Sequence, residues 1–161
     1  MWSTLKNSIS LLLLLFIFQH TSLAQLPKKI QNLAGTWNYQ GGSGYEIFQV
    51  QNGELYGESY LKTKVGMTYY VEQIRVKYVN KNLIYETIPV KGDSLIHSKK
   101  STFISERRRM KFEHTDNSYP AAVKYKISCF NKNKLKITIY PIVEDQKKKV
   151  LRLTRNVDGT L

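Results

Sequence analysis

The sequence predicts an all-β protein, an antiparallel up-and-down meander of about 8 to 10 strands closed into a β-barrel. After residue 24 no stretch keeps a helical period, whereas apolar and polar residues alternate in run after run. Residues that tolerate positive φ separate the runs, which favours hairpins between successive strands. Closure into a barrel removes the exposed edges of an open sheet, and a two-sheet sandwich is the alternative.

The alternating runs predict ten strands in chain order. They cover residues 36–40, 45–50, 54–62, 68–78, 82–88, 101–105, 109–114, 121–129, 134–140 and 150–155. Residues 25–33 precede them and form a short helix or a cap over one barrel end. In the last three strands apolar residues share one face and lysines the other, so one face is core and the other is solvated. The same alternation predicts that Cys129, the single cysteine, is a small buried residue.

The first 24 residues have the layout of a secretory signal. Lys6 gives the charged start, residues 9–18 the apolar run and Ser22-Leu23-Ala24 the cleavage site. The apolar run is shorter than the ~20 residues that a membrane-spanning helix needs, and a retained anchor is the alternative. We therefore expect a signal peptide over 1–24 that is cleaved after Ala24, a single barrel domain over 25–161, and a periplasmic or secreted protein.

Charge is the second compositional feature. Without the signal, the chain keeps 24 basic against 12 acidic residues, a net charge of +12. This charge favours anionic partners, so an anionic envelope surface is one expected partner, although a lysine-rich solvated surface is the plainer interpretation. Nucleic acid is not expected as a partner, because the charges are spread along the chain and no nucleic-acid recognition motif is present.

Two positions far apart in the chain indicate how one barrel end is closed. Gly35-Thr36-Trp37 lies on the first predicted strand, and Arg155 continues the inward register of the last. This pairing resembles the lipocalin and calycin superfamily. In that superfamily an arginine from the last strand lies over the tryptophan of a Gly-x-Trp motif and closes one end. The resemblance implies a structural role in barrel closure for Gly35, Trp37 and Arg155.

A second resemblance covers most of the chain after the signal. The segments at 33–37, 52–57, 72–76 and 112–120 look like an exported bacterial lipocalin-like family that is known only as a domain of unknown function. In the most specific segment, Phe112, Glu113, Tyr119 and Pro120 keep the family's frame. Asn117 and Ser118 stand where the family usually has His and Asp, which argues against an acid-base role for that pair. The resemblance implies a fold and no activity.

A few polar residues alternate with inward-facing apolar ones. Glu46 shares a face with Phe48, Glu72 with Ile74, and His114 with Phe112. A carboxylate inside a small barrel is costly unless it is paired, so such a group often marks a ligand site. The alternative is that both glutamates face solvent or pair with Arg75 at the rim. The candidate ligand-binding residues are Glu46, Phe48, Glu72, Tyr85, His114 and Tyr119, with the two tyrosines as possible donors to the glutamates.

Three functions are compatible with these residues. The favoured one is a barrel that binds a small hydrophobic, amphipathic or lipid-like molecule, which the basic composition allows to be anionic. The second is a packed structural or envelope-associated barrel that acts through its basic surface. The third is an enzyme with Glu72 or Glu46 as base and His114 as acid. No cofactor or metal site is expected, because the sequence lacks a phosphate-binding loop and a Cys/His cluster.

Overall fold

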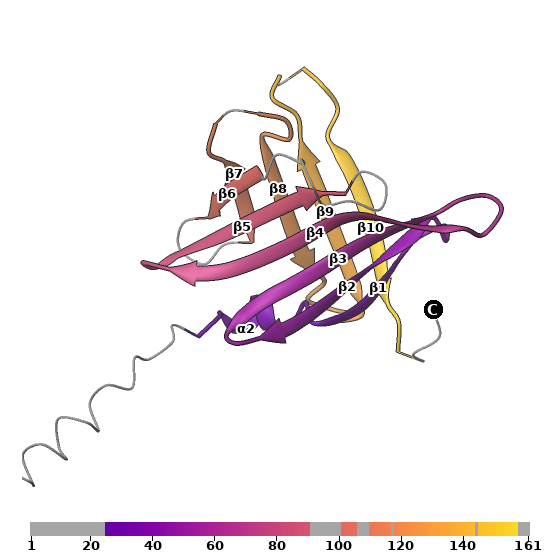
Figure 1. Cartoon of the computed structure of the whole chain (residues 1–161), viewed down its shortest axis with the longest axis horizontal. Coiled ribbons are helices and arrows are strands. Elements are labelled where there is room, and N and C mark those ends of the chain that lie inside the picture. The colour runs from indigo at the N-terminus through magenta and orange to yellow at the C-terminus, as the bar shows by residue number, and fades with distance from the viewer. Residues whose placement is uncertain (1–24, 91–100, 106–109, 117, 144, 158–161) are drawn as a thin grey trace, which may run out of the picture.

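A computed structural model describes residues 25–90, 101–105, 110–116, 118–143 and 145–157 (Figure 1). Within these residues ten strands follow one short helix. The helix is α2 (Lys28–Gln31), and the strands are β1 (Gly35–Tyr39), β2 (Gly44–Gln51), β3 (Glu54–Lys62), β4 (Thr68–Val79), β5 (Asn82–Pro89), β6 (Ser101–Ser105), β7 (Lys111–His114), β8 (Ala122–Ile127), β9 (Lys134–Tyr140) and β10 (Lys149–Arg155). The predicted signal peptide at 1–24 lies outside the described residues, and among the described residues no helix is long and apolar enough to cross a membrane.

The strands form one closed antiparallel barrel. Each pairs with its neighbours in the chain, and β1 pairs with β10 to complete the ring. The predicted meander is therefore confirmed, and the sandwich alternative is wrong. The bounds of β3, β6 and β9 are those predicted, because a period of two is a strong signal where polar and apolar residues alternate strictly.

One burial prediction is wrong. Cys129 is exposed, because β8 ends at Ile127 and the alternation does not continue into the turn that follows. In that turn the backbone N–H of Asn131 donates to the Ser128 hydroxyl, and the backbone N–H of Asn133 donates to Oδ1 of Asn131. Such side-chain bonds stabilise a turn against continuation of the strand.

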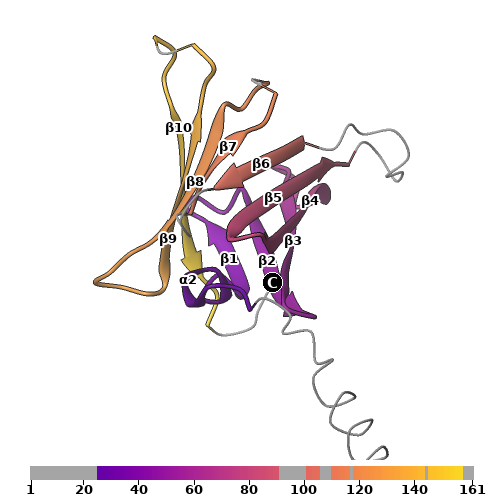
Figure 2. The same cartoon turned by 90° about the vertical axis from the view of Figure 1, so that its left-hand side faces the viewer.

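Inward-facing side chains from all ten strands and from the N-terminal segment fill much of the barrel. Ile30 of α2 is fully buried and contributes to the same cluster. The segment before β1 thus acts as the predicted cap, and Figure 2 shows α2 against one barrel end. The largest fully buried side chains are Trp37, Phe48, Phe103, Phe112, Ile30, Leu33, Leu55, Ile74, Leu83, Leu135, Leu153 and Val76.

The capped end is held by a tryptophan and an arginine. The guanidinium of Arg155 lies 4.2 Å from the centroid of the Trp37 ring. It donates to the carbonyls of Ala34 at 2.5 Å and Asn32 at 2.7 Å, while the indole N–H of Trp37 donates to Leu33 O at 2.7 Å. These bonds tie the cap segment to the first and last strands. The contact that the superfamily resemblance implies is therefore present in this chain.

Gly35 makes room for that contact. Its φ is +121°, and a Cβ added there would lie 2.7 Å from Nη1 of Arg155. A side chain at this position would displace the guanidinium and strain the backbone. The motif thus needs its glycine for the close approach of the arginine.

Candidate functional site

A cavity of about 640 Å³ opens at the barrel end opposite the cap. We call the part of its lining formed by Tyr39, Ser59 and Glu72 the floor, and the part formed by Leu61, Val71 and Leu151 the wall. Sites for small molecules usually enclose a few hundred Å³ or more, so this space is large enough for one. The lining residues are Tyr39, Gln40, Ser43, Ser59, Leu61, Val71, Glu72, Pro89, Lys149, Val150, Leu151 and Arg152.

Glu46 lies directly behind this floor. It is 4% exposed, and its Oε1 accepts a hydrogen bond from the Tyr39 hydroxyl at 2.8 Å. The same hydroxyl lies 3.3 Å from Oγ of Ser59. Oε2 of Glu46 is buried without a hydrogen-bond partner among the described residues. An unsatisfied buried carboxylate oxygen is costly, and this marks Glu46 as an unusual residue of the interior.

The environment disfavours a charge on Glu46. Burial raises the pKa of its carboxyl from 4.5 to about 7, and the nearby charge of Glu72 raises it further, while the hydrogen bond from Tyr39 opposes the rise. Among the described residues no ion pair neutralises Glu46. The carboxyl can therefore gain or lose a proton near neutral pH.

Glu72 faces the cavity itself. Burial raises the pKa of its carboxyl as well, and a hydrogen bond from Thr87 works against that rise. Its charge also contributes to raising the pKa of the Tyr39 and Tyr85 hydroxyls. Two carboxyls and several hydroxyls thus share one small region of the interior.

A pair of tyrosines extends this polar region into the core. The hydroxyls of Tyr85 and Tyr125 lie 3.1 Å apart, and both side chains are buried. Burial raises the pKa of Tyr85 well above its ordinary value, with the charge of Glu72 as the next cause. Their rings pack against Phe112, with centroids 5.0 Å and 6.4 Å from its ring. Below the cavity the interior is therefore filled by aromatic rings.

Three of the six predicted ligand-binding residues lie together, and the other three have different surroundings. Glu46, Glu72 and Tyr85 lie close enough to influence one another's ionisation. Phe48 lies deeper, where its ring packs over Gly57 and meets Tyr125 edge-on at 6.2 Å. The structure therefore brings the two glutamates together with one of the two predicted tyrosines.

The other two predicted residues have different surroundings. The side chain of His114 is 3% exposed, its ring packs 4.5 Å from Phe103, and its Nδ1 lies 2.5 Å from Oδ1 of Asp116. Its Nε2 is buried and lacks a hydrogen-bond partner among the described residues. Tyr119 is 61% exposed on the loop between β7 and β8. No hydrogen bond or ion pair of the described residues joins His114 to either glutamate, which weakens the acid-base hypothesis.

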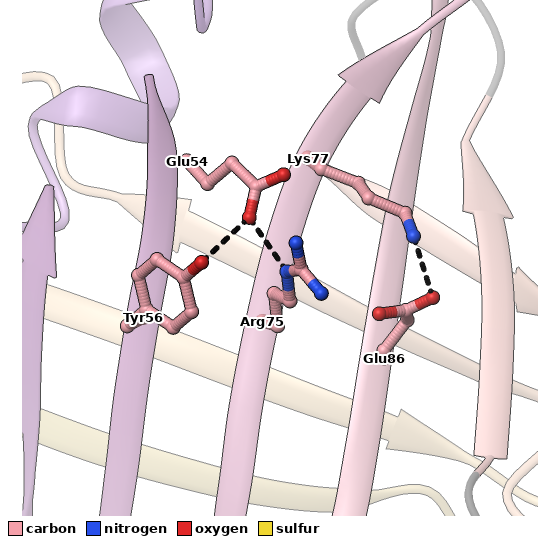
Figure 3. Close-up of polar contacts among 5 residues, drawn as sticks. All are labelled: Glu54, Tyr56, Arg75, Lys77 and Glu86. Carbon is pink, nitrogen blue, oxygen red and sulfur yellow. Dashed lines mark hydrogen bonds and ion pairs between the residues drawn. The ribbon is translucent and has the colours of Figure 1, made fainter. Parts of the chain in front are cut away.

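Arg75 does not partner the interior glutamates. Its Nε lies 2.6 Å from Oε2 of Glu54, which also accepts from Tyr56 at 2.8 Å, all on the outer face (Figure 3). The alternative that Glu46 faces solvent or pairs with Arg75 is therefore wrong.

Two residues of the site, Tyr39 and Ser59, were not predicted as site residues. Each shares an inward register with a buried apolar residue, Tyr39 with Trp37 and Ser59 with Leu55. The signal for them was the alternation itself. A hydroxyl in an inward register indicates a site residue in the same way as a carboxylate does.

Among the described residues no group of three or more His, Cys, Asp or Glu side chains is arranged to hold a metal ion. Comparison of the chain with protein-family models, with curated proteins and with solved structures gave no significant match. The chemistry of the site therefore rests on its geometry. It offers hydrogen-bond acceptors, a proton-exchanging carboxyl and an apolar wall.

Proposed function

We propose that this protein is an exported lipocalin-like barrel that binds a small amphipathic molecule through its open end. The observation that carries the proposal is the cavity of about 640 Å³ whose floor carries Glu72 and the Tyr39 hydroxyl, with the unsatisfied Glu46 behind it. A carboxyl buried in a packed apolar interior is costly, so two carboxyls at a cavity favour a binding site over a filled barrel. Export rests on the signal-like layout of the first 24 residues.

The polar floor and apolar wall define how the ligand enters. Leu61, Val71 and Leu151 line the wall, whereas the acceptors lie at the bottom. A molecule that enters head first places its polar head on the floor and its tail along these apolar side chains. Lys149 and Arg152 also line the cavity, but both are exposed, so a head placed on the floor meets Glu72. There a head that donates hydrogen bonds or carries positive charge is favoured, because an anionic head would meet the carboxylate of Glu72.

The test compares twelve-carbon amphiphiles that differ only in their heads: dodecylamine, dodecanol and dodecanoate. Binding to the purified protein is measured by isothermal titration calorimetry and by native mass spectrometry. We expect one molecule to bind per chain, with the amine tightest and the carboxylate weakest. Since each tenfold change in affinity is about 1.4 kcal/mol, one charge-assisted hydrogen bond to Glu72 predicts a preference for the amine of about tenfold or more.

Glu72→Gln removes the charge of the floor and keeps its shape. We expect this variant to lose most of the preference for the amine over the alcohol. Glu58→Gln is the matched control, because Glu58 is exposed and accepts from Tyr60 on the outer face. Failure of all three amphiphiles to bind, or equal losses in the two variants, would refute the proposal.

A further inference from the structure

A row of positive charges crosses the outer face of three strands. Lys126 of β8 lies opposite Lys136 of β9, which in turn lies opposite Arg152 of β10, and all three side chains are exposed. Directly opposed residues in antiparallel strands have Cβ atoms about 5 Å apart. On the adjoining strands Lys111 lies opposite Lys124. We call the outer face that carries these residues of β7 to β10 the basic face, and Figure 2 shows its strands side by side.

The outer face of the opposite barrel wall is built differently. There Arg75 lies opposite Glu86 in the ladder and pairs with Glu54 at 2.6 Å, and Lys77 pairs with Glu86 at 2.9 Å (Figure 3). Cations and carboxylates therefore neutralise one another on β3 to β5.

No such neutralisation occurs in the row on the basic face. Among the described residues no carboxylate forms an ion pair with Lys126, Lys136 or Arg152, while on β7 of the same face Lys111 pairs with Glu113. Residues 118–157 contain ten lysines and arginines and two acidic residues, and both acidic residues fall between β9 and β10 in the sequence. Within the part of the chain that the structure describes, the row thus has no neutralising carboxylate.

Direct opposition of like charges works against the fold. Such pairs destabilise a sheet, whereas a surface that serves only solubility can stagger its lysines or mix in acidic residues. A negatively charged partner that lies along the row would remove this repulsion and gain contacts with three cations at once. The row is therefore better explained as an interaction surface than as a solvated one.

Two grooves run beside the row and share residues. One, of about 430 Å³, is lined by Lys126, Lys134, Lys136 and Arg152, together with the 99% exposed Phe130. The other, of about 1030 Å³, lies between α2 and the ends of β7 and β8. Both include Lys126, Ser128 and Cys129, so they meet at the turn after β8. Cations in the second groove are Lys29, Lys111, Lys124, Lys126, Lys132 and Arg155, and the described lining of neither groove contains a carboxylate.

We propose that the basic face binds a linear acidic polysaccharide. Connected grooves suit a flexible chain with closely spaced negative groups better than they suit a flat membrane. Single-stranded nucleic acids are usually held by several exposed aromatic rings that stack on bases. The described lining of the two grooves has one exposed ring, Phe130, because Tyr125 is buried. Arg152 also lines the cavity, whereas Lys126 and Lys136 do not. The proposal can therefore be tested at Lys136 independently of the ligand proposed for the cavity.

The test measures binding of the purified protein to polygalacturonate, which carries carboxylates, and to dextran sulfate, which carries sulfates. Neutral dextran and a single-stranded DNA oligonucleotide are the comparison polymers. We expect binding to at least one acidic polysaccharide and none to neutral dextran. Affinity should fall with salt, since each protein cation that displaces a counterion makes log K fall more steeply with log salt, by about 0.7 per contact on single-stranded nucleic acid. The polysaccharide that binds identifies which anionic group is recognised.

Lys136→Glu reverses the charge at the centre of the row. We expect binding to weaken at least tenfold and the salt slope to fall by about 0.7 or more. The thermal midpoint should rise by about 2 to 5 °C, because two repulsive pairs become attractive ones. A gain in stability with a loss of binding excludes misfolding as the cause of weak binding.

Lys64→Glu is the matched control, since it makes the same change of charge at an exposed position in the turn between β3 and β4. It should change binding less than threefold. Equal losses in the two variants would show that net charge alone drives binding and would overturn the proposal. Tighter binding to the DNA oligonucleotide than to both polysaccharides, or no binding to either at low salt, would also overturn it.

Discussion

Replacing Glu46 by glutamine should change how the stability of the barrel depends on pH. In the unfolded chain the carboxyl ionises near 4.5, whereas burial and the charge of Glu72 raise its pKa to about 7 in the folded protein. The folded state therefore binds this proton more tightly. The stability that Glu46 contributes is complete below 4.5 and is lost as pH rises through about 7.

The size of the effect follows from the shift. One pKa unit corresponds to about 1.4 kcal/mol, so the rise from 4.5 to about 7 predicts a loss of about 3 kcal/mol between acid and mildly alkaline pH. Glutamine cannot ionise and has nearly the shape of the protonated carboxyl. The free energy of unfolding of Glu46→Gln, relative to the unsubstituted protein, should therefore increase by about 3 kcal/mol over that interval.

Urea unfolding measured by tryptophan fluorescence provides the assay, because Trp37 is fully buried and reports on the closed end. Unfolding free energies are compared at about pH 4 and about pH 8.5 for both proteins. Groups that titrate equally in the two proteins cancel in the difference. Glu58→Gln separates loss of a buried charge from loss of a surface charge. Parallel stability curves for Glu46→Gln and the unsubstituted protein would refute the reasoning about its burial.

Two further predictions concern the packing of the barrel. Arg155→Lys should lower the free energy of unfolding by about 2 kcal/mol in thermal or urea melts. The reason is that one ammonium cannot both reach the carbonyls of Asn32 and Ala34 and stack on Trp37. Arg152→Lys on the same strand is the control and should change the free energy of unfolding by less than about 0.5 kcal/mol. Gly57→Ala should cost about 1 to 3 kcal/mol in the same assays, because the new Cβ would lie 2.5 Å from the Phe48 ring. Adding Phe48→Leu should recover part of that loss, and a double variant no more stable than Gly57→Ala would contradict the steric explanation.

Strict alternation explains why so much of the fold could be predicted. Strands such as β9 alternate exposed lysines with buried leucine and isoleucine, and a period of two assigns both the element and its faces. The same rule predicts that Glu46 and Glu72 lie on the inward face. Alternation is a poor guide to where a strand ends, because the pattern can continue in the sequence after the strand has stopped. Cys129 fits the apolar alternation of Val123, Tyr125 and Ile127 in the sequence, but β8 ends at Ile127 and Cys129 is exposed.

Partners within the site were harder to predict, because they depend on register between strands. Trp37 lies directly opposite Glu46 in the ladder between β1 and β2, which makes Tyr39 a diagonal neighbour. Diagonal neighbours are about 7 to 8 Å apart, a distance that the long tyrosine side chain can span to reach the carboxylate. Sequence alone gives neither this register nor the curvature that brings Ser59 within 3.3 Å of the same hydroxyl. The faces were therefore predictable, whereas the hydrogen bonds between them were not.

Strand β10 connects the two proposed sites and also shows why they can be tested separately. Leu151 lines the cavity and Leu153 is buried in the core, while Arg152 between them is exposed, completes the row of cations and also lines the cavity. Lys136 does not line the cavity. Residues one position apart on a strand point to opposite faces, so a substitution at Lys136 leaves the inward apolar set unchanged. Surface charges are also screened over about 10 Å at ordinary ionic strength. Lys136→Glu should therefore leave the amine preference of the cavity intact, and Glu72→Gln should leave polysaccharide binding intact. Coupling between these two readouts would mean that one site acts through the fold on the other.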